Sequence, residues 1–202
     1  LVVFYLYQET SYENCHQNAD RIFRPTYHIQ AQGDFEVHFA RIPVDFINKL
    51  PEDIPEIEKL VRLQNKEQKY IRVNKDRFKP DHAYISDNEI FEVFSLPFII
   101  GDPVTALNNP YSVVLTERIA QKYYSSTNII GKEIVVIGDW SGEEKVYQVT
   151  GVIQDLPANT HLPIEMLFSF TNEAERTGWA YVYTLLSEEG SINDLESKMP
   201  DF

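Results

Sequence analysis

The chain of 202 residues is 43% hydrophobic and 24% charged, which excludes a disordered protein and fits one globular domain or two small ones. Its net charge of −13 repels nucleic-acid phosphates and anionic membrane surfaces, so we expect neither as a partner. Twelve Tyr and twelve Phe favour a fold that contains sheets, because aromatic side chains suit half-buried pleated surfaces.

The first segment of the chain is apolar and then becomes one-sided. Residues 1–7 (LVVFYLY) allow two interpretations: a buried first strand or helix turn, or the outer end of a membrane helix, with Tyr5 and Tyr7 at the interface. From Tyr5 to Ile22, apolar residues recur at steps of three, four and seven, which predicts an amphipathic helix that ends before Pro25. The sequence has no run of 18 apolar residues, so it holds no complete predicted membrane span.

Strands dominate the prediction for the next third of the chain. A short helix is predicted at 43–50, because proline is tolerated in a first helical turn, and Pro51-Glu52-Asp53 is expected to end it. Runs of apolar and alternating residues predict strands at 23–32, 35–42, 57–63, 69–73 and 78–86.

The remainder mixes helices and strands. A helix is predicted at 87–94 with an Asp or Asn cap, and another begins after the cap Thr116 and runs to Tyr124. Its inward face should carry Ile119, Ala120 and Tyr123. Strands are expected at 112–115, 133–137, 145–153, 164–170 and 179–186, and a last helix capped by Ser191 at 191–199.

These elements lack a regular alternation of strand and helix, which predicts an α+β fold with more than one sheet. Proline and glycine are dense near 97–110 and 157–163. Because such residues interrupt regular structure, we expect two hinges there that bracket an inserted subdomain.

Few residues have a spacing that chemistry would require. The sequence has no GxSxG, HExxH, GxxxxGK[ST] or GxGxxG motif. His16 and Asp20 are an i, i+4 pair that could hold a metal, although a solvated helix face explains the spacing as well. Ser169, His161 and Asp155 could form a nucleophile, base and orienting acid, but anchoring of the 156–163 loop is the favoured role for His161.

The remaining candidates are acidic, aromatic or thiol groups. The acidic segments Glu52–Glu58 and Glu143-Glu144 lack the spacing of a calcium loop and are expected to be solvated. Cys15 has no neighbouring lysine to activate it. Tyr123, Tyr124 and Trp140 could form a recognition surface, with at least one of the two tyrosines in the core. We therefore expect no catalytic, cofactor or metal site, and the sequence does not single out residues that bind a substrate or partner.

Several stretches resemble a known family in the family's order along nearly the whole chain. They are residues 9–13 (ETSYE), 16–24 (HQNADRIFR), 91–97 (FEVFSLP), 101–103 (GDP), 112–116 (SVVLT), 130–132 (IGK) and 147–162 (YQVTGVIQDLPANTHL). In this pattern the chain is similar to MacB-like periplasmic core domains of FtsX-like ABC-transporter permeases. It departs from the family at Cys15, where a bulky apolar residue is usual, which is expected to loosen the first helix.

The resemblance implies a fold of two subdomains. A membrane-proximal stalk helix (1–22) would precede a porter-like half that contains a βαβ unit and is built from both chain ends (23–95 and 164–202), with a sabre-like α/β subdomain inserted at 96–163. A final porter-like strand is expected beyond Phe202. The porter-like core should contain Ile29, Leu60, Leu167 and Tyr183, and the inserted core Val113, Val114, Ile119, Ile134, Val136, Val149 and Val152.

The resemblance also implies the function. The domain would lie in the periplasm as part of a permease in the cell inner membrane, would not be an enzyme itself, and would transmit ATP-driven motion to partners outside the membrane. Expected partners are a second permease copy, a cytoplasmic ATPase subunit and an envelope adaptor or lipoprotein. The alternative is a free-standing periplasmic binding or adaptor domain for a peptide or envelope protein.

Overall fold

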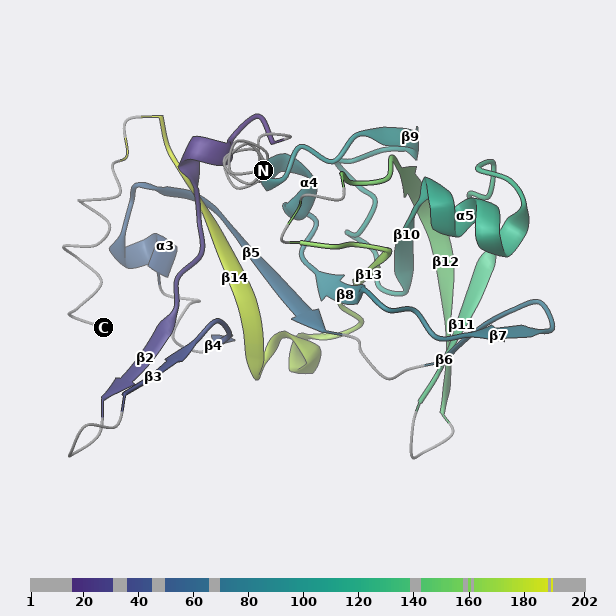
Figure 1. Ribbon diagram of the computed structural model, residues 1–202, viewed down its shortest axis with the longest axis horizontal. Helices are drawn as coiled ribbons and strands as arrows, with labels where there is room; N and C mark the ends of the chain where they lie inside the picture. The colour runs from purple at the N-terminus through teal and green to yellow at the C-terminus, as the bar shows by residue number, and fades with distance from the viewer. Residues whose placement is uncertain are drawn as a thin grey trace, which may run out of the picture.

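The computed structural model describes residues 16–30, 36–44, 50–65, 70–138, 143–157, 160, 162–188 and 190 (Figure 1). The strands of its main sheet are β1 (Ile22–Phe23), β4 (Ile42–Pro43), β5 (Ile57–Asn65), β6 (Tyr70–Val73), β7 (Asp76–Phe78), β8 (Ala83–Ser86), β9 (Phe98–Gly101), β10 (Ser112–Thr116), β11 (Glu133–Ile137), β12 (Glu144–Ile153), β13 (Met166–Ser169) and β14 (Trp179–Leu186). A separate hairpin joins β2 (Tyr27–Gln30) to β3 (Glu36–Phe39). The helical segments are η1 (Ala19–Arg21), α3 (Leu50–Asp53), α4 (Ile90–Val93), α5 (Glu117–Tyr124) and η2 (Glu173–Arg176).

One hydrogen-bonded path runs through the sheet in the order β1-β14-β5-β8-β13-β10-β12-β11-β6-β7. Strand β4 adds to β14, and β9 adds to β12. Figure 1 shows the long pair β5 and β14 towards one end and β11 and β12 towards the other, with β8 and β13 between them. The described part is therefore richer in strand than the α+β class expected from the sequence, because segments distant in sequence complete one another's hydrogen bonds across the sheet.

The centre of the sheet is covered on both faces. All five residues of β10 are buried, and β10 lies between parallel β12 and antiparallel β13. A strand buried on both faces is expected to be continuously apolar, as Val113, Val114 and Leu115 are. The short helix α4 contributes its buried residues to the apolar cluster on one face, and α5 contributes Ile119, Ala120 and Tyr123 to the cluster on the other.

The two apolar clusters account for most of the expected core. Leu167 and Tyr183 lie in the α4 cluster, as predicted, and Leu60 packs on a third, smaller cluster around α3. Val113 lies in the α5 cluster, together with Ile119, Ile134, Val136, Val149 and Val152.

The prediction for Val114 is wrong, because Val114 belongs to the α4 cluster. Val113 and Val114 are consecutive in β10, and consecutive strand side chains point to opposite faces. The side chain of Ile29 lies outside the described residues. The two clusters are thus separated by the two faces of the sheet, and β6, from the first half of the chain, pairs with β11.

Local geometry corrects two helix predictions near the start of the chain. Ile22 begins β1 and pairs with Leu185 of β14, so the helix expected through Ile22 gives way to η1 and a strand. Residues 1–15 lie outside the described part. Pro43 lies in β4 opposite Trp179 instead of opening a helix. Pro51, expected to end that helix, lies at the second residue of α3, where a missing N–H is tolerated.

The cap of α4 differs from prediction, whereas α5 has the predicted cap residue with a different capping bond. The N-terminal position of α4 is Glu89, which makes no side-chain cap bond, and Asp87 is used elsewhere. Thr116 occupies the predicted N-cap position of α5 without bonding through its side chain. The backbone N–H of Arg118 donates instead to Asp155 Oδ1 at 3.1 Å, so a carboxylate from the β12–β13 connection caps this helix.

Within the described residues, no helix is long and apolar enough to cross a membrane.

Candidate functional site

The structure separates the metal-pair candidates His16 and Asp20. His16 is buried, and its ring packs edge-on against Phe94 with the centroids 5.2 Å apart. Asp20 is exposed, and the intervening turn and 3-10 geometry do not place the two residues on one α-helical face. The interpretation of His16 as part of a solvated helix face is therefore wrong. Across the described ranges, no group of three or more His, Cys, Asp or Glu side chains could hold a metal ion.

The serine-histidine-aspartate candidates are not assembled among the residues whose side chains are described. Ser169 is fully buried in β13, and its Oγ accepts a 2.9 Å hydrogen bond from the backbone N–H of Ser112. Asp155 caps α5. His161 lies outside the described residues. A buried hydroxyl already engaged by the backbone is poorly placed for nucleophilic attack.

Two of the acidic candidates, Glu144 and Glu58, form ion pairs. Both carboxylate oxygens of Glu144 on β12 accept from the guanidinium of Arg72 on β6, in a bidentate pair. This bond holds the pKa of Glu144 below its ordinary value. Glu58 pairs with Arg21 at 3.4 Å. The prediction that Glu144 is only solvated is corrected by its pair with Arg72.

The aromatic candidates divide between core and surface. Tyr123 is buried in the α5 cluster and stacks on Phe78, with the ring centroids 4.2 Å apart, as expected for at least one tyrosine. Tyr124 is half-buried and donates its hydroxyl to the carbonyl of Glu133 at 2.9 Å. Cys15 and Trp140 lie outside the described residues.

Asp87, a buried carboxylate that sequence analysis offered as a helix cap, forms a polar cluster with Arg62 and Arg176. Asp87 is 5% exposed and accepts three hydrogen bonds from Arg62: the backbone N–H to Oδ2 at 3.0 Å, Nε to Oδ2 at 2.8 Å and Nη2 to Oδ1 at 2.7 Å. Arg176 donates through Nη1 to the same Oδ1. The guanidinium of Arg176 also lies 4.5 Å from the ring centre of Phe170, which fixes its plane. Asp87 thereby joins β5, the β8–α4 junction and η2.

Asn88, the next residue, ties down a loop from a different part of the chain. Its side-chain amide donates to the carbonyls of Pro103 and Val104 at 3.0 and 2.9 Å, and its Oδ1 accepts from the N–H of Leu107 at 2.8 Å. A cavity of about 230 Å³ lies beside this pair of residues. Its charged lining consists of Arg62, Arg176, Asp87 and Glu89. These formal charges cancel, so a charged ligand would find no net attraction here. The four side chains serve better to hold the surrounding elements together, and we call the group Arg62, Asp87 and Arg176 the Asp87 clasp.

A second cavity, of about 330 Å³, lies where α5 begins. It is lined by His82, Arg118, Asp155, Leu156, Pro157, Thr160, Pro163, Ile164 and Glu165. The volume and the mixture of apolar walls with a few polar groups are typical of binding sites. Its loop belongs to the stretch 147–162, one of the stretches that carry the family resemblance.

Glu165 is the buried charge of this second cavity. Its Oε2 accepts from the backbone N–H groups of Asp81 and His82 at 2.9 and 3.3 Å, and its Oε1 accepts from Arg118 Nη2 at 3.2 Å. Burial by itself would raise the pKa of Glu165, but the two backbone donors and Arg118 outweigh it and hold the pKa below its ordinary value. Glu165 therefore stays ionised near neutral pH.

The sequence did not reveal the polar contacts of Asp87 or those of Glu165, and the reason is the same for both. Asp87 lies 25 residues from Arg62 and 89 from Arg176, and Glu165 lies 47 residues from Arg118. No local spacing links charges so far apart in the chain, and only the strand order of the sheet brings them together.

Comparison with known proteins identifies relatives of this architecture. The family model described as the MacB-like periplasmic core domain matches residues 7–202. No curated protein sequence matches the chain at a significant level.

Solved structures share the fold at low sequence identity. A domain assigned to a permease protein from Porphyromonas gingivalis is 20% identical with a TM-score of 0.75, and the match covers 92% of this chain and 81% of that one. The periplasmic region of MacB from Actinobacillus actinomycetemcomitans is 15% identical with a TM-score of 0.62, over 89% of this chain and 79% of that one. The extracellular domain of the noncanonical ABC-type transporter YknZ from Gram-positive bacteria is 15% identical with a TM-score of 0.58, over 88% of each chain.

Proposed function

Because the chain belongs to the family of MacB-like periplasmic core domains, we propose that it transmits ATP-driven motion across the membrane and contacts partners or substrate in the envelope. The family forms the periplasmic part of ABC-transporter permeases of the FtsX-like kind and is not a known enzyme family. We further propose that the permease lies in the cell inner membrane, pairs with a second copy and works with a cytoplasmic ATPase subunit and an envelope adaptor or lipoprotein.

The observation that carries this proposal is the continuity of the sheet. A hydrogen-bonded path joins β1 and β14 to β6 and β7 without interruption, and the buried Asp87 clasp holds three elements against one another along it. Displacement of one end of such a body moves the other, because interiors packed like this transmit strain. ATP-driven change can bias the domain only if its conformations differ in their contacts with a partner.

We also propose the division into a porter-like half (23–95 and 164–202) and an inserted sabre-like subdomain (96–163). Ile119, Ile134 and Val149 of the inserted segment share one apolar cluster, which supports a common packing of that segment. Ile71 and Phe168 belong to the same cluster, so this core is continuous with the porter-like half. The bonds from Asn88 to the 103–107 loop would then fasten one part to the other.

The test is a reversible lock between two copies of the full transporter in cells. Cys15 is first replaced by Ser, and single cysteines are then placed at exposed positions of the inserted segment, such as Val104, Ile130 and Val146. A position that cross-links two copies under oxidation should abolish transport or release activity, and reduction should restore it. An exposed position that does not cross-link is the matched control.

Full activity in an oxidised, cross-linked transporter would overturn the proposed transmission of motion. Hydrolysis of an envelope component by the purified chain, abolished by one His or Asp substitution, would overturn the proposal that the domain is not an enzyme.

A further inference from the structure

The cavity at the start of α5 contains a guanidinium that the chain itself supplies. Arg118 projects from the first turn of the helix, and its side chain is 61% exposed. Within the described part of the chain, its guanidinium makes one hydrogen bond, the 3.2 Å contact with Glu165 Oε1. Glu165 is 7% exposed in the same pair, so a fixed, buried carboxylate faces a largely solvated cation. An ion pair of this kind contributes little, because water screens the charge of the exposed guanidinium and one hydrogen bond holds it in place.

The walls of the cavity suit the stem of a long basic side chain. Leu156, Pro157, Pro163 and Ile164 line it on the apolar side, and Asp155 and Glu165 supply the carboxylates. Lysine and arginine bury an aliphatic stem along apolar surface while the charged head stays near polar groups. The cavity presents both components of such a site.

Charge favours a cation over an anion here. Among the described residues, the lining holds two carboxylates, of Asp155 and Glu165, against one permanent cation, that of Arg118, within a chain of net charge −13. An incoming anion would meet this surplus of negative charge, whereas an incoming cation is complementary to it. The positive end of α5 opposes a cation, but the carboxylate of Asp155 already lies on that end and offsets it.

We propose that this cavity receives an arginine or lysine side chain of a partner protein, and that Arg118 is a resident guanidinium which the incoming group displaces. The inference rests on the partner contact in the proposed function and names its chemistry. The lining residues come from the start of α5, from the β12–β13 connection and from the segment before β8. A side chain bound in the cavity would therefore contact both the proposed inserted subdomain and the proposed porter-like half.

The experiment uses the 202-residue chain labelled with ¹⁵N and the probe Nα-acetyl-arginine N-methylamide, followed by amide chemical shifts. The neutral analogue Nα-acetyl-citrulline N-methylamide, of nearly the same shape, is the control for charge. We expect the arginine probe to shift the amides of Leu156, Ile164 and Glu165 and the citrulline analogue to leave them unchanged.

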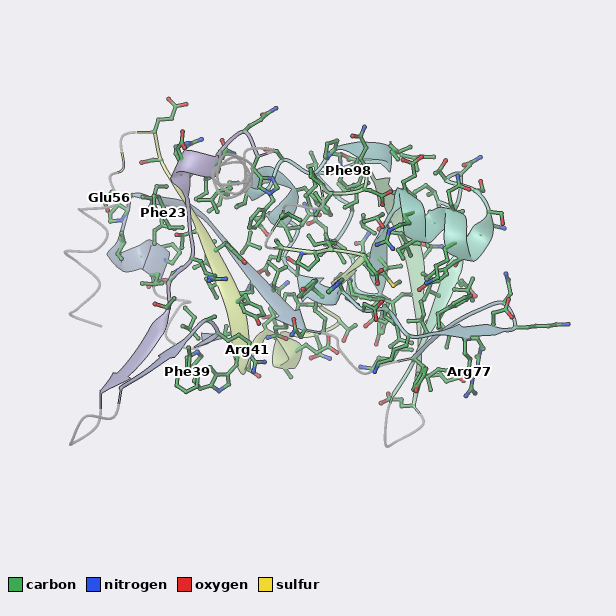
Figure 2. The ribbon with its side chains drawn as sticks, viewed as in Figure 1. Phe23, Phe39, Arg41, Glu56, Arg77 and Phe98 are labelled. Atoms are coloured by element: carbon green, nitrogen blue, oxygen red, sulfur yellow. The ribbon has the colours of Figure 1, made fainter. Side chains whose placement is uncertain are left out.

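Matched variants separate displacement from general attraction to an acidic protein. Arg118→Ala removes the resident competitor, and Arg77→Ala makes the same change in net charge on the β6–β7 hairpin (Figure 2). Arg118→Ala should bind the probe about threefold more tightly than Arg77→Ala, the range expected when a weak exposed ion pair no longer competes. Asp155→Asn keeps an oxygen for the Arg118 N–H but loses the charge, so it should bind more weakly than Asp76→Asn, an exposed carboxylate on β7.

Three results would overturn the inference: equal affinity in Arg118→Ala and Arg77→Ala, equal shifts from the citrulline analogue, or shifts spread over the surface without focus on the cavity. These results leave the cross-linking test untouched. Full activity of the cross-linked transporter would in turn leave the measured affinity of the cavity unchanged, so the two proposals fail separately.

Discussion

At the scale of single residues, two neighbouring tyrosines of α5 have opposite polar environments. Tyr123 is buried, and among the described residues its hydroxyl has no hydrogen-bond partner. The Tyr124 hydroxyl donates to Glu133. The helical spacing of the sequence correctly placed Tyr123 in the core, since apolar residues three and four apart share one helix face. It could not predict that the hydroxyl is left without a partner.

We expect the two Tyr→Phe substitutions to have different effects on stability. In Tyr123→Phe, the free energy of unfolding should stay the same or rise by up to about 1 kcal/mol, because an unpaired buried hydroxyl is removed. In Tyr124→Phe it should fall by about 1 kcal/mol, because a hydrogen bond is lost. Urea denaturation at neutral pH measures both, and a larger loss in Tyr123→Phe than in Tyr124→Phe would contradict the assignment.

The same tyrosines predict a loss of stability in alkali. Burial raises the pKa of Tyr123 to about 12, with Glu165 and Asp81 adding to the shift and Arg118 opposing it, and burial raises that of Tyr124 to about 12, with Glu133 adding. Between the ordinary pKa of 10.0 and about 12, the unfolded chain loses protons that the folded chain keeps. The folded state then binds more protons, so the free energy of unfolding falls as pH rises through this window.

The measurement is a series of urea titrations from neutral pH to pH about 12 on the wild-type chain and on the Tyr123→Phe, Tyr124→Phe double variant. The variant should lose less stability across the alkaline window. If the free energy of unfolding fell equally with pH in the two proteins, these hydroxyls would titrate alike in the folded and unfolded states.

At the scale of elements, strand periodicity predicted most strands of the described part, but it missed β9 and placed Pro43 of β4 in a helix. Segments 133–137 and 112–115 were predicted within one residue of β11 and β10, because uninterrupted apolar or alternating runs bounded by turn residues have one interpretation. The predicted strand 78–86 divides into the end of β7 and β8, with Pro80 between them. The helix at 43–50 was wrong at its start, because Pro43 pairs with Trp179, a contact 136 residues away that no local rule describes.

Strand β9 depends on a close approach of two backbones. Gly101 has a φ of +107°, and a Cβ there would lie 2.6 Å from the carbonyl oxygen of Thr150 and 2.8 Å from the Cα of Gly151. Gly178 has a comparable φ of +89°, but no atom lies within 4 Å of its Cβ position. The pair of glycines separates backbone strain from lack of space.

We expect Gly101→Ala to lower the free energy of unfolding by about 3 kcal/mol, because strain and a backbone clash add. The cost of Gly178→Ala should be about 1 kcal/mol, from the left-handed backbone alone. Chemical denaturation of both variants is the measurement. Equal costs would mean that β9 moves away from β12 without penalty.

At the scale of the whole molecule, the sheet order was beyond the reach of the sequence. An α+β class with two cores was expected, whereas β8, β13 and β10 form a shared centre whose two faces carry the two clusters. Local patterns show which residues of a strand are buried, but they do not tell which strand lies beside it. The buried pair of Arg62 and Asp87 depends on that unseen order, since it requires β5 beside β8.

The clasp at Asp87 should contribute to the stability of the whole molecule. Asp87→Asn leaves Arg62, 15% exposed in this pair, without its compensating charge, and the free energy of unfolding should fall by about 3 kcal/mol. Glu173 is the matched control, because it also pairs with Arg176, at 3.3 Å, but is 91% exposed. Glu173→Gln should change stability by less than about 0.5 kcal/mol in the same urea titration. If the free energy of unfolding fell by similar amounts in both variants, the buried ion pairs of Asp87 would contribute no more to stability than an exposed one.

The two end strands of the sheet path affect whether the protein can aggregate at high concentration. An edge strand has backbone N–H and C=O groups without hydrogen-bond partners, so a strand of another copy can add to it and start a fibre. Long, flat, apolar edge strands are the most prone to this. Here the path ends in β1, of two residues, and β7, of three, and β7 carries the exposed charges of Asp76 and Arg77. Because β1 is so short and β7 is both short and charged, these two ends offer few backbone groups with which another copy could extend the sheet. We therefore expect the two ends of this path to resist growth of the sheet from one copy to the next, even at high protein concentration.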